Sequence, residues 1–310
     1  MAFRLKKKES VSKAVRRLGR ERMDDALQCL AHRERAQTVH RVRKDIKRVR
    51  AVVQLVRSEI PKKACGRITG LLREAADQLS PIRDAYVKAM MLKKLKQHFP
   101  GLLAPGAFRH TLTELRDVFD EEMKRFAKKR IARKVARSLR GVEKELNQLK
   151  VSGKGWKALC PGVKASYSKG QRAYQTVLKD SSPENFHEWR KSAKTLWYQV
   201  TLLQRIWPEQ MDAMADELDK LGDLLGDDHD CVMLREATDE KGAVDAKQAE
   251  LEMLKGLIDE RQSELRTAAL AIGSRFYSEK PSVFCNRLAG YWQIWRNERS
   301  PGIKSAEATS

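Results

Sequence analysis

The sequence predicts an all-α protein made of two similar helical bundles that are related by approximate symmetry. Apolar residues recur with the period of an α-helix along almost the whole chain, and no segment shows the strict alternation of a half-buried strand. A basic helix that begins with histidine occurs twice, at His40 and at His187, 147 residues apart. An internal repeat of this length indicates two structural units built to one plan.

The first half is expected to contain five helical segments. Ser80 and Pro81 are interpreted as an N-cap and a first-turn proline. Prolines and glycines between positions 100 and 106 interrupt the helical pattern. The expected helices cover about 10–35, 38–59, 61–80, 80–98 and 107–150.

The second half is expected to follow a linker and to repeat this order. Residues 151–162 contain three glycines and one proline, and the composition changes there from strongly basic to neutral. Expected helices cover about 163–179, 183–208, 208–225, a segment after a turn at 226–230, 245–276, and the residues from 281 onward. The sequence thus predicts bundles at 10–150 and 163–297 and a disordered tail at 298–310.

Both repeated helices are amphipathic with one basic face. Offsets of 3, 4 and 7 residues place four side chains on one side of a helix, here His40, Arg43, Lys44 and Lys47, and again His187, Arg190, Lys191 and Lys194. The opposite arcs are apolar: Val42, Ile46, Val49, Val53 and Val56, and Phe186, Trp189, Ala193, Leu196, Val200 and Leu203. A merely solvated face usually mixes Glu with Lys, whereas like charges at these spacings repel. Two cationic faces without a carboxylate indicate a site for a highly anionic ligand.

The net charge of the chain points to the same kind of partner. The 310 residues carry a net charge of +22, and residues 1–150 hold 40 Lys and Arg against 17 Asp and Glu. Residues 151–310 hold 23 against 24. An excess this large favours a polyanion, which could be nucleic acid, polyphosphate or an anionic membrane.

Cysteine usage and hydropathy indicate a cytoplasmic protein. The five cysteines are scattered, odd in number and form no CxxC, which argues against a disulfide framework and a zinc site and fits a reducing compartment. No apolar run approaches the ~20 residues of a membrane span, and no signal core follows the basic N-terminus.

A second repeated segment follows each basic helix. Residues 79–84 match residues 225–230 at an offset of 146. Each copy places a residue that can carry a positive charge, Arg83 or His229, directly before an aspartate, Asp84 or Asp230. The aspartates are interpreted as groups that orient neighbouring donors, and simple helix capping is the alternative.

Together these motifs resemble the CHAD domain, the conserved histidine α-helical domain, over about residues 10–297. The resemblance implies two four-helix bundles packed about a pseudo-twofold axis, with a basic channel or groove between them that binds inorganic polyphosphate. The chain departs from the family pattern at 195–197, where an Arg-rich continuation is common, and at 80–81, where glycine is usual. It contains no ExExK signature, so hydrolysis of triphosphates is not implied.

The resemblance assigns polyphosphate-binding roles by position. Contacts are implied for the histidine helices, for the two turns and for a basic strip in the opening helix of each half. These residues are His40, Arg43, Lys44, Lys47, Arg50, Arg83, Arg16, Arg20 and Arg22, and His187, Arg190, Lys191, Lys194, Tyr198, His229, Tyr167, Lys169 and Arg172.

Two other functions remain open. A nucleic-acid binder is favoured by the run at 124–140, which has nine cations, no acid and an apolar stripe, although no base-reading module is recognisable. A metal-dependent phosphohydrolase is suggested only by Asp228-His229-Asp230, and no Walker loop, GxGxxG or nucleophile elbow occurs. We therefore expect a non-enzymatic polyphosphate binder without cofactor or metal, in the cytoplasm or on polyphosphate granules, with RNA or DNA bound at most non-specifically.

Overall fold

Every regular element in the described part of the chain is a helix, which confirms the predicted all-α class. The structure is a computed structural model, and it describes residues 3–32, 36–104, 106–239 and 245–298. The tail predicted to be disordered lies outside the described residues from position 299 onward. None of the described helices is long and apolar enough to span a bilayer.

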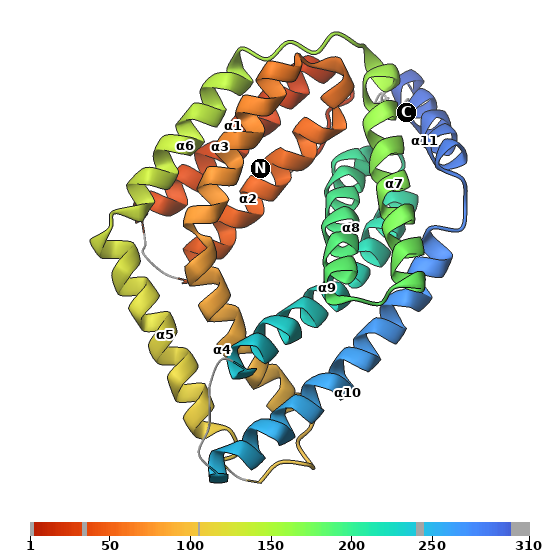
Figure 1. The fold of residues 1–310 in the computed structure, drawn as a ribbon. Helices are drawn as coiled ribbons and strands as arrows, with labels where there is room; N and C mark the ends of the chain where they lie inside the picture. The colour runs from red at the N-terminus through yellow and green to blue at the C-terminus, as the bar shows by residue number, and fades with distance from the viewer. Residues whose placement is uncertain (1–2, 33–35, 105, 240–244, 299–310) are drawn as a thin grey trace, which may run out of the picture.

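Helices from the first half form one packed group. They are α1 (Val11–His32), α2 (Ala36–Leu55), α3 (Lys62–Gln78) and α6 (Ile131–Asn147), with the short 3-10 helix η1 (Arg57–Glu59) after α2. Within this group α1 packs on α2 and α6, and α3 packs on α6. Figure 1 shows α2 on the side of this group that faces the second half.

Helices from the second half form another packed group. They are α7 (Gly155–Lys179), α8 (Pro183–Leu203), the first part of α9 (Pro208–Asp239) and α11 (Pro281–Asn297), with the 3-10 helix η2 (Gln204–Ile206) before α9. In this group α8 packs on α7 and α9, and α11 packs on α7. In Figure 1, α8 lies on the side that faces α2.

The remaining helices come from both halves and share a separate core. They are α4 (Ser80–His98), α5 (Arg109–Lys128), the end of α9 and α10 (Asp245–Phe276), and they occupy the lower part of Figure 1. Leu92 of α4 and Phe108 before α5 are buried in one cluster with Leu234 of α9 and Ile258 of α10. Helices of one half are therefore packed against helices of the other.

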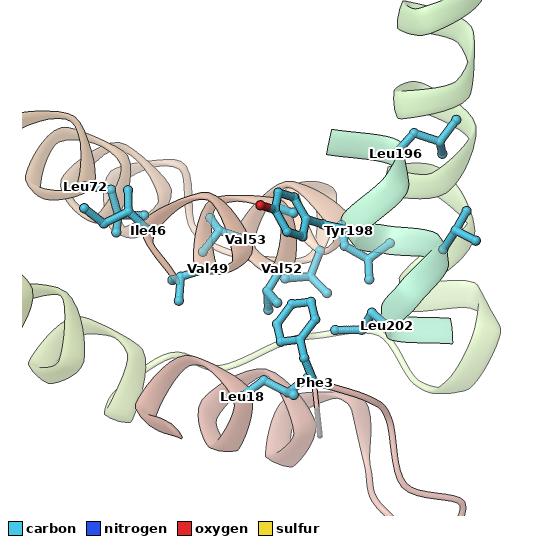
Figure 2. Close-up of a cluster of buried hydrophobic side chains, with 14 of the residues drawn as sticks. Phe3, Leu18, Ile46, Val49, Val52, Val53, Leu72, Leu196, Tyr198 and Leu202 are labelled. Carbon is cyan, nitrogen blue, oxygen red and sulfur yellow. The ribbon is translucent and has the colours of Figure 1, made fainter. Parts of the chain in front are cut away.

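The two larger groups also share one apolar core. Figure 2 shows Val52 and Val53 of α2 facing Tyr198 and Leu202 of α8, with Phe3 beside them. The segment before α1 is attached there, because the backbone N–H of Leu5 donates to the carbonyl oxygen of Leu202 at 3.1 Å. The bundle boundaries and the pseudo-twofold relation remain predictions, but the core is continuous across them.

The prediction of a turn at 226–230 is wrong. Residues 208–239 form one uninterrupted helix, α9, whereas the matching residues of the first half form α3 and α4 with Leu79 between them. A Cβ at Gly226 would lie 3.6 Å from Nε of Arg190, which is an ordinary van der Waals contact, so packing does not require glycine there. Packing of α9 on α8 and α10 outweighs the low helix propensity of this glycine.

Three other local predictions also need correction. Helix α7 begins at Gly155, inside the predicted linker, and contains Pro161. The predicted helix over 107–150 is broken where Arg130 adopts a left-handed conformation with φ of 51°. Ser80 makes no cap hydrogen bond, because its hydroxyl donates to the carbonyl of Ala76 at 3.2 Å.

One cysteine pair departs from the expectation of no disulfide framework. Cys160 of α7 and Cys285 of α11 are bonded through their sulfur atoms, with Cα atoms 6.1 Å apart. This pair links two helices of the second half. The cysteines at 29, 65 and 231 are free.

Candidate functional site

The two basic helices turn their cationic faces toward a shared hollow. All residues of the two predicted apolar arcs are buried, which confirms those arcs. Because the apolar arcs pack inward, the opposite faces of α2 and α8 line a cavity of about 610 Å³ together with α4 and α9. This central cavity is lined by the cationic or titratable residues His40, Arg43, Lys44, Lys47, Arg83, Lys94, Arg190 and Lys194 and by the acids Asp219, Asp223, Asp227 and Asp230.

A second hollow of about 370 Å³ continues from the central cavity between α2, α7 and α8. The two hollows share Lys47, Arg190, Lys194 and Tyr198. None of the described residues that line the second hollow carries a carboxylate. We call it the cationic passage, and its cations are Lys47, Arg50, Arg57, Lys169, Arg190, Lys191 and Lys194.

The cations of α2 are available to a ligand. Arg43 donates to the carbonyl of Ala76 at 2.7 Å and to the Ser80 hydroxyl at 3.0 Å, so neutral partners hold its guanidinium at the start of α4. Burial and then the Arg83 charge lower the pKa of Arg43, and the Asp84 charge opposes that shift. Burial among protein atoms, and then the charges of Arg190 and Arg43, lower the pKa of Lys47 to about 7. The Lys47 residue is nevertheless solvent-accessible inside the cavity. Within the described part of the chain, no carboxylate pairs with the basic face of α2.

Two cations of α8, Lys191 and Lys194, are already paired, whereas no ion pair is formed by Arg190 within the described residues. The Lys194 ammonium lies 3.0 Å from the carboxylate of Asp219 and 2.9 Å from that of Asp223, both on α9. Lys191 pairs with Glu188 at 2.5 Å, one turn earlier on α8. The basic face of α8 carries no carboxylate of its own, but carboxylates from α9 and from Glu188 beside the face neutralise two of its cations. Attraction to α9 offsets the repulsion that like charges on one helix face would produce.

Arg83 connects the two halves at the central cavity. Its guanidinium lies 3.1 Å from the Asp84 carboxylate and 2.9 Å from the Asp230 carboxylate. Burial raises the pKa of Asp230, and the nearby Arg83 charge opposes that rise. The two aspartates of the repeated motif thus hold the same guanidinium in one orientation.

The three histidines of the motifs are neutral near pH 7. The rings of His187 and His229 lie 4.1 Å apart between centroids. Burial lowers the pKa of His187 to about 4 and that of His229 to about 3, with further lowering by neighbouring charges that include Arg190. Burial and then Lys47 also lower the pKa of His40. An anion bound nearby would reverse the electrostatic part of these shifts.

Two residues implied by the resemblance are not available to a ligand. Tyr167 is fully buried, and its hydroxyl donates to the backbone carbonyls of Phe276 at 3.0 Å and Glu279 at 3.2 Å. Arg22 is 5% exposed and forms an ion pair with Asp25 at 2.9 Å. Both side chains are used inside the fold, which corrects their assignment as phosphate contacts.

The rest of the predicted basic strip is dispersed. Arg16 and Arg20 on α1 and Arg172 on α7 are exposed but line neither the central cavity nor the cationic passage. Lys169 lines the cationic passage, and Tyr198 lines both hollows. The structure therefore brings together residues of the basic helices and the first turn and leaves most of the strip outside.

Sequence reasoning missed an acidic stripe on α9. Asp219, Asp223, Asp227 and Asp230 share one face of the helix and all line the central cavity. Asp227 also pairs with Lys94 of α4 at 2.6 Å, a cation that the sequence interpretation did not include. The spacing of the four aspartates could have predicted this stripe. It was missed because the helix was expected to end at 225, which would separate the first two aspartates from the last two.

The two alternative motifs have clear positions in the fold. The nine cations of the 124–140 run are all exposed, on the end of α5, on the turn at 129–130 and on α6, at the outer edge seen in Figure 1. The side chains of 228–230 point to different partners, since Asp228 accepts from Arg266 at 2.7 Å while Asp230 accepts from Arg83. Across the described residues, no three His, Cys, Asp or Glu side chains gather as metal ligands would.

These features define an all-helical protein whose two halves share a cation-lined cavity. The model of the CHAD domain family matches residues 13–239. The chain therefore belongs to the CHAD domain family.

Two solved structures have a similar fold at low sequence identity. The crystal structure of the CHAD domain from the plant Ricinus communis aligns with a TM-score of 0.65 and 14% identity, over 90% of this chain and 95% of that one. PptA from Streptomyces chartreusis aligns with a TM-score of 0.60 and 13% identity, over 82% of this chain and 95% of that one. No curated protein matches the sequence.

Proposed function

We propose that the protein binds inorganic polyphosphate in the central cavity and the cationic passage. The observation that carries the proposal is the convergence of the two repeated basic helices. Lys47 of α2 and Arg190 of α8 line both hollows, and the Arg190 charge contributes to the lowered pKa of Lys47. Cations held this close are costly unless a ligand with dense negative charge neutralises them.

The shape of the site favours a flexible chain over a compact ligand. The hollows follow one face of α2 from His40 to Gln54 and continue to Arg57 of η1, so donors recur along a path. Polyphosphate carries charge on each phosphate and has no base that would need a recognition pocket. Arginine offers bidentate hydrogen bonds and lysine a point charge. Each charge-assisted hydrogen bond contributes roughly 1.5–3 kcal/mol, so several suffice for tight binding.

The proposed role is binding without turnover, as in a protein that associates with polyphosphate or its granules. The cavity residues supply cations and orienting aspartates, and Arg83 is held between two carboxylates as a fixed donor. Incubation with long-chain polyphosphate should release no orthophosphate above a protein-free control. Sustained release by the wild type that is lost in a cavity variant would replace this role with catalysis.

A competition titration tests the proposed ligand. Labelled long-chain polyphosphate should bind at physiological salt and should be displaced by unlabelled polyphosphate at far lower phosphate concentration than by RNA or ATP. The nine exposed cations of the 124–140 run support RNA as the second candidate. Equal displacement by RNA per phosphate would favour that candidate, and displacement by ATP at equal molecule number would indicate a nucleotide pocket.

A further inference from the structure

A third hollow lies beyond the cationic passage, between η1, α3 and α7. Its volume is about 830 Å³. One face of α3 lines it with residues at helical spacing, beginning at Lys62 and ending at Arg73. Arg57 of η1 adds a third cation. We call this hollow the α3 pocket.

The α3 pocket is open along the backbone of α3. A Cβ at Gly66 or Gly70 would meet no atom within 4 Å, so this face of the helix is not covered by another element. The far wall exists because Gly162 of α7 packs directly on the end of α2, where a Cβ would lie 1.9 Å from the carbonyl oxygen of Leu55. Glycine at 162 thus lets α7 approach closely and close one side of the pocket.

The charge of the α3 pocket differs from that of the central cavity. Its three cations are exposed, and among the described residues none of them forms an ion pair. No described residue that lines the pocket carries a carboxylate, whereas four aspartates line the central cavity. A polyanion would therefore meet no competing acid in the lining of the α3 pocket.

The α3 pocket adjoins the cationic passage. The two share Gln54, Arg57, Gly162 and Ala165 in their linings. Arg50 of the passage is close enough to Arg73 of the pocket for the Arg73 charge to add to the effect of burial in lowering the Arg50 pKa. The buried Nε of Arg50 also has no hydrogen-bond partner in the described structure.

We propose that the α3 pocket is a second polyanion subsite, which a long polyphosphate chain reaches from the central cavity through the cationic passage. This inference rests on the proposed function and extends it to chain length. The cations at the two ends of the α3 face are separated by eleven residues, or roughly 16 Å of helix. A short chain that occupies the central cavity cannot also reach them. Long chains thus gain contacts at Lys62 and Arg73 that short chains lack.

The test compares two variants with equal loss of charge. The first carries Lys62→Gln and Arg73→Gln, which line the α3 pocket but not the cationic passage, and the control carries Arg133→Gln and Lys134→Gln on the exposed face of α6. Affinity is measured for long-chain polyphosphate and for tripolyphosphate. The first variant should lose roughly tenfold or more in affinity for the long chain and less than about twofold for tripolyphosphate. The control should lose little for either ligand.

The charge-preserving variant Lys62→Arg, Arg73→Lys keeps the test valid if the Gln variant unfolds, and it should retain most of the long-chain affinity. Equal losses in the α3 and α6 variants, or equal losses for long and short chains, would overturn the subsite. Failure of wild-type protein to bind either ligand would instead overturn the proposed function. If the wild type binds polyphosphate, and an Arg43→Gln, Lys47→Gln variant loses this binding while the α3-pocket variant does not, the proposed function would be supported and the second subsite would be rejected.

Discussion

The guanidinium of Arg83 on α4 lies 2.9 Å from the carboxylate of Asp230 on α9, so the repeated motif of one half is completed by the aspartate of the other. Asp84, which occupies the corresponding position in the first half, holds the same guanidinium at 3.1 Å. This arrangement fixes a cation at the central cavity and ties α4 to α9. Loss of this ion pair should lower the free energy of unfolding and should also change the position of Arg83 in the central cavity.

Replacing Asp230 by Asn should lower the free energy of unfolding by about 1–3 kcal/mol, because a hydrogen bond to a charged group is lost at a largely enclosed position. Asp227→Asn provides a matched control on the same helix. Its pair with Lys94 is more exposed, so about 0–1 kcal/mol is expected. Urea denaturation measures both values, and equal losses would argue against a special role for the Arg83–Asp230 pair.

Removing the counter-charges of Lys194 should strengthen polyphosphate binding. In an Asp219→Asn, Asp223→Asn variant, the Lys194 ammonium no longer has to exchange a carboxylate for a phosphate. We expect an increase in affinity of roughly fivefold or more. The control is Glu209→Gln with Asp216→Asn, which removes two charges from α9 outside the central cavity. A similar gain in both variants would mean that only net charge matters.

Lys47 should take up a proton when polyphosphate binds at pH 8. In the free protein its pKa is about 7, so at pH 8 most of the amine is neutral. A bound polyanion favours the ammonium form and raises this pKa, so affinity should fall as pH increases above 7. Calorimetry in buffers of different ionisation enthalpy detects the uptake. Lys47→Arg should bind without it, and unchanged uptake in that variant would assign the proton to another group.

Stability should decrease as pH falls below 6.5 because of His187 and His229. The pKa values of these histidines in the folded protein are about 4 and about 3, against 6.5 in the unfolded chain. Between pH 6.5 and pH 4 the unfolded chain therefore binds more protons than the folded chain. The free energy of unfolding therefore falls from pH 6.5 toward pH 4. A His187→Asn, His229→Asn variant should show a shallower dependence in this window, while His110→Asn on α5 should retain the wild-type slope.

Two variants that lose the same number of charges should distinguish direct contacts at the central cavity from general attraction by the positive charge of the protein. The first replaces Arg43, Lys44, Arg190 and Lys191 by Gln, and the second replaces Lys128, Lys129, Arg133 and Lys134 by Gln. Loss of direct charge-assisted bonds should weaken polyphosphate binding by at least about tenfold more in the first variant. Gln supports helices, so both should remain folded by circular dichroism. Equal weakening would shift the site to the 124–140 run.

The sequence by itself determined the helical class, most helix positions and the two amphipathic basic helices. Periodicity is a local property, and the apolar arcs from Val42 to Val56 and from Phe186 to Leu203 are buried as expected. The same reasoning failed at Gly226 and Pro161, where turn-forming residues lie inside α9 and α7. There, contacts with distant helices compensate for poor local propensity.

Only the tertiary structure decided which of the predicted cations are available to a ligand. Helical spacing tells which residues share a face, but not which residues from other helices lie opposite. Lys194 is paired with aspartates of α9, Tyr167 is buried in the core, and Lys47 remains without a counter-charge in the described structure. These differences arise from contacts between separate helices, which no local pattern in the sequence specifies.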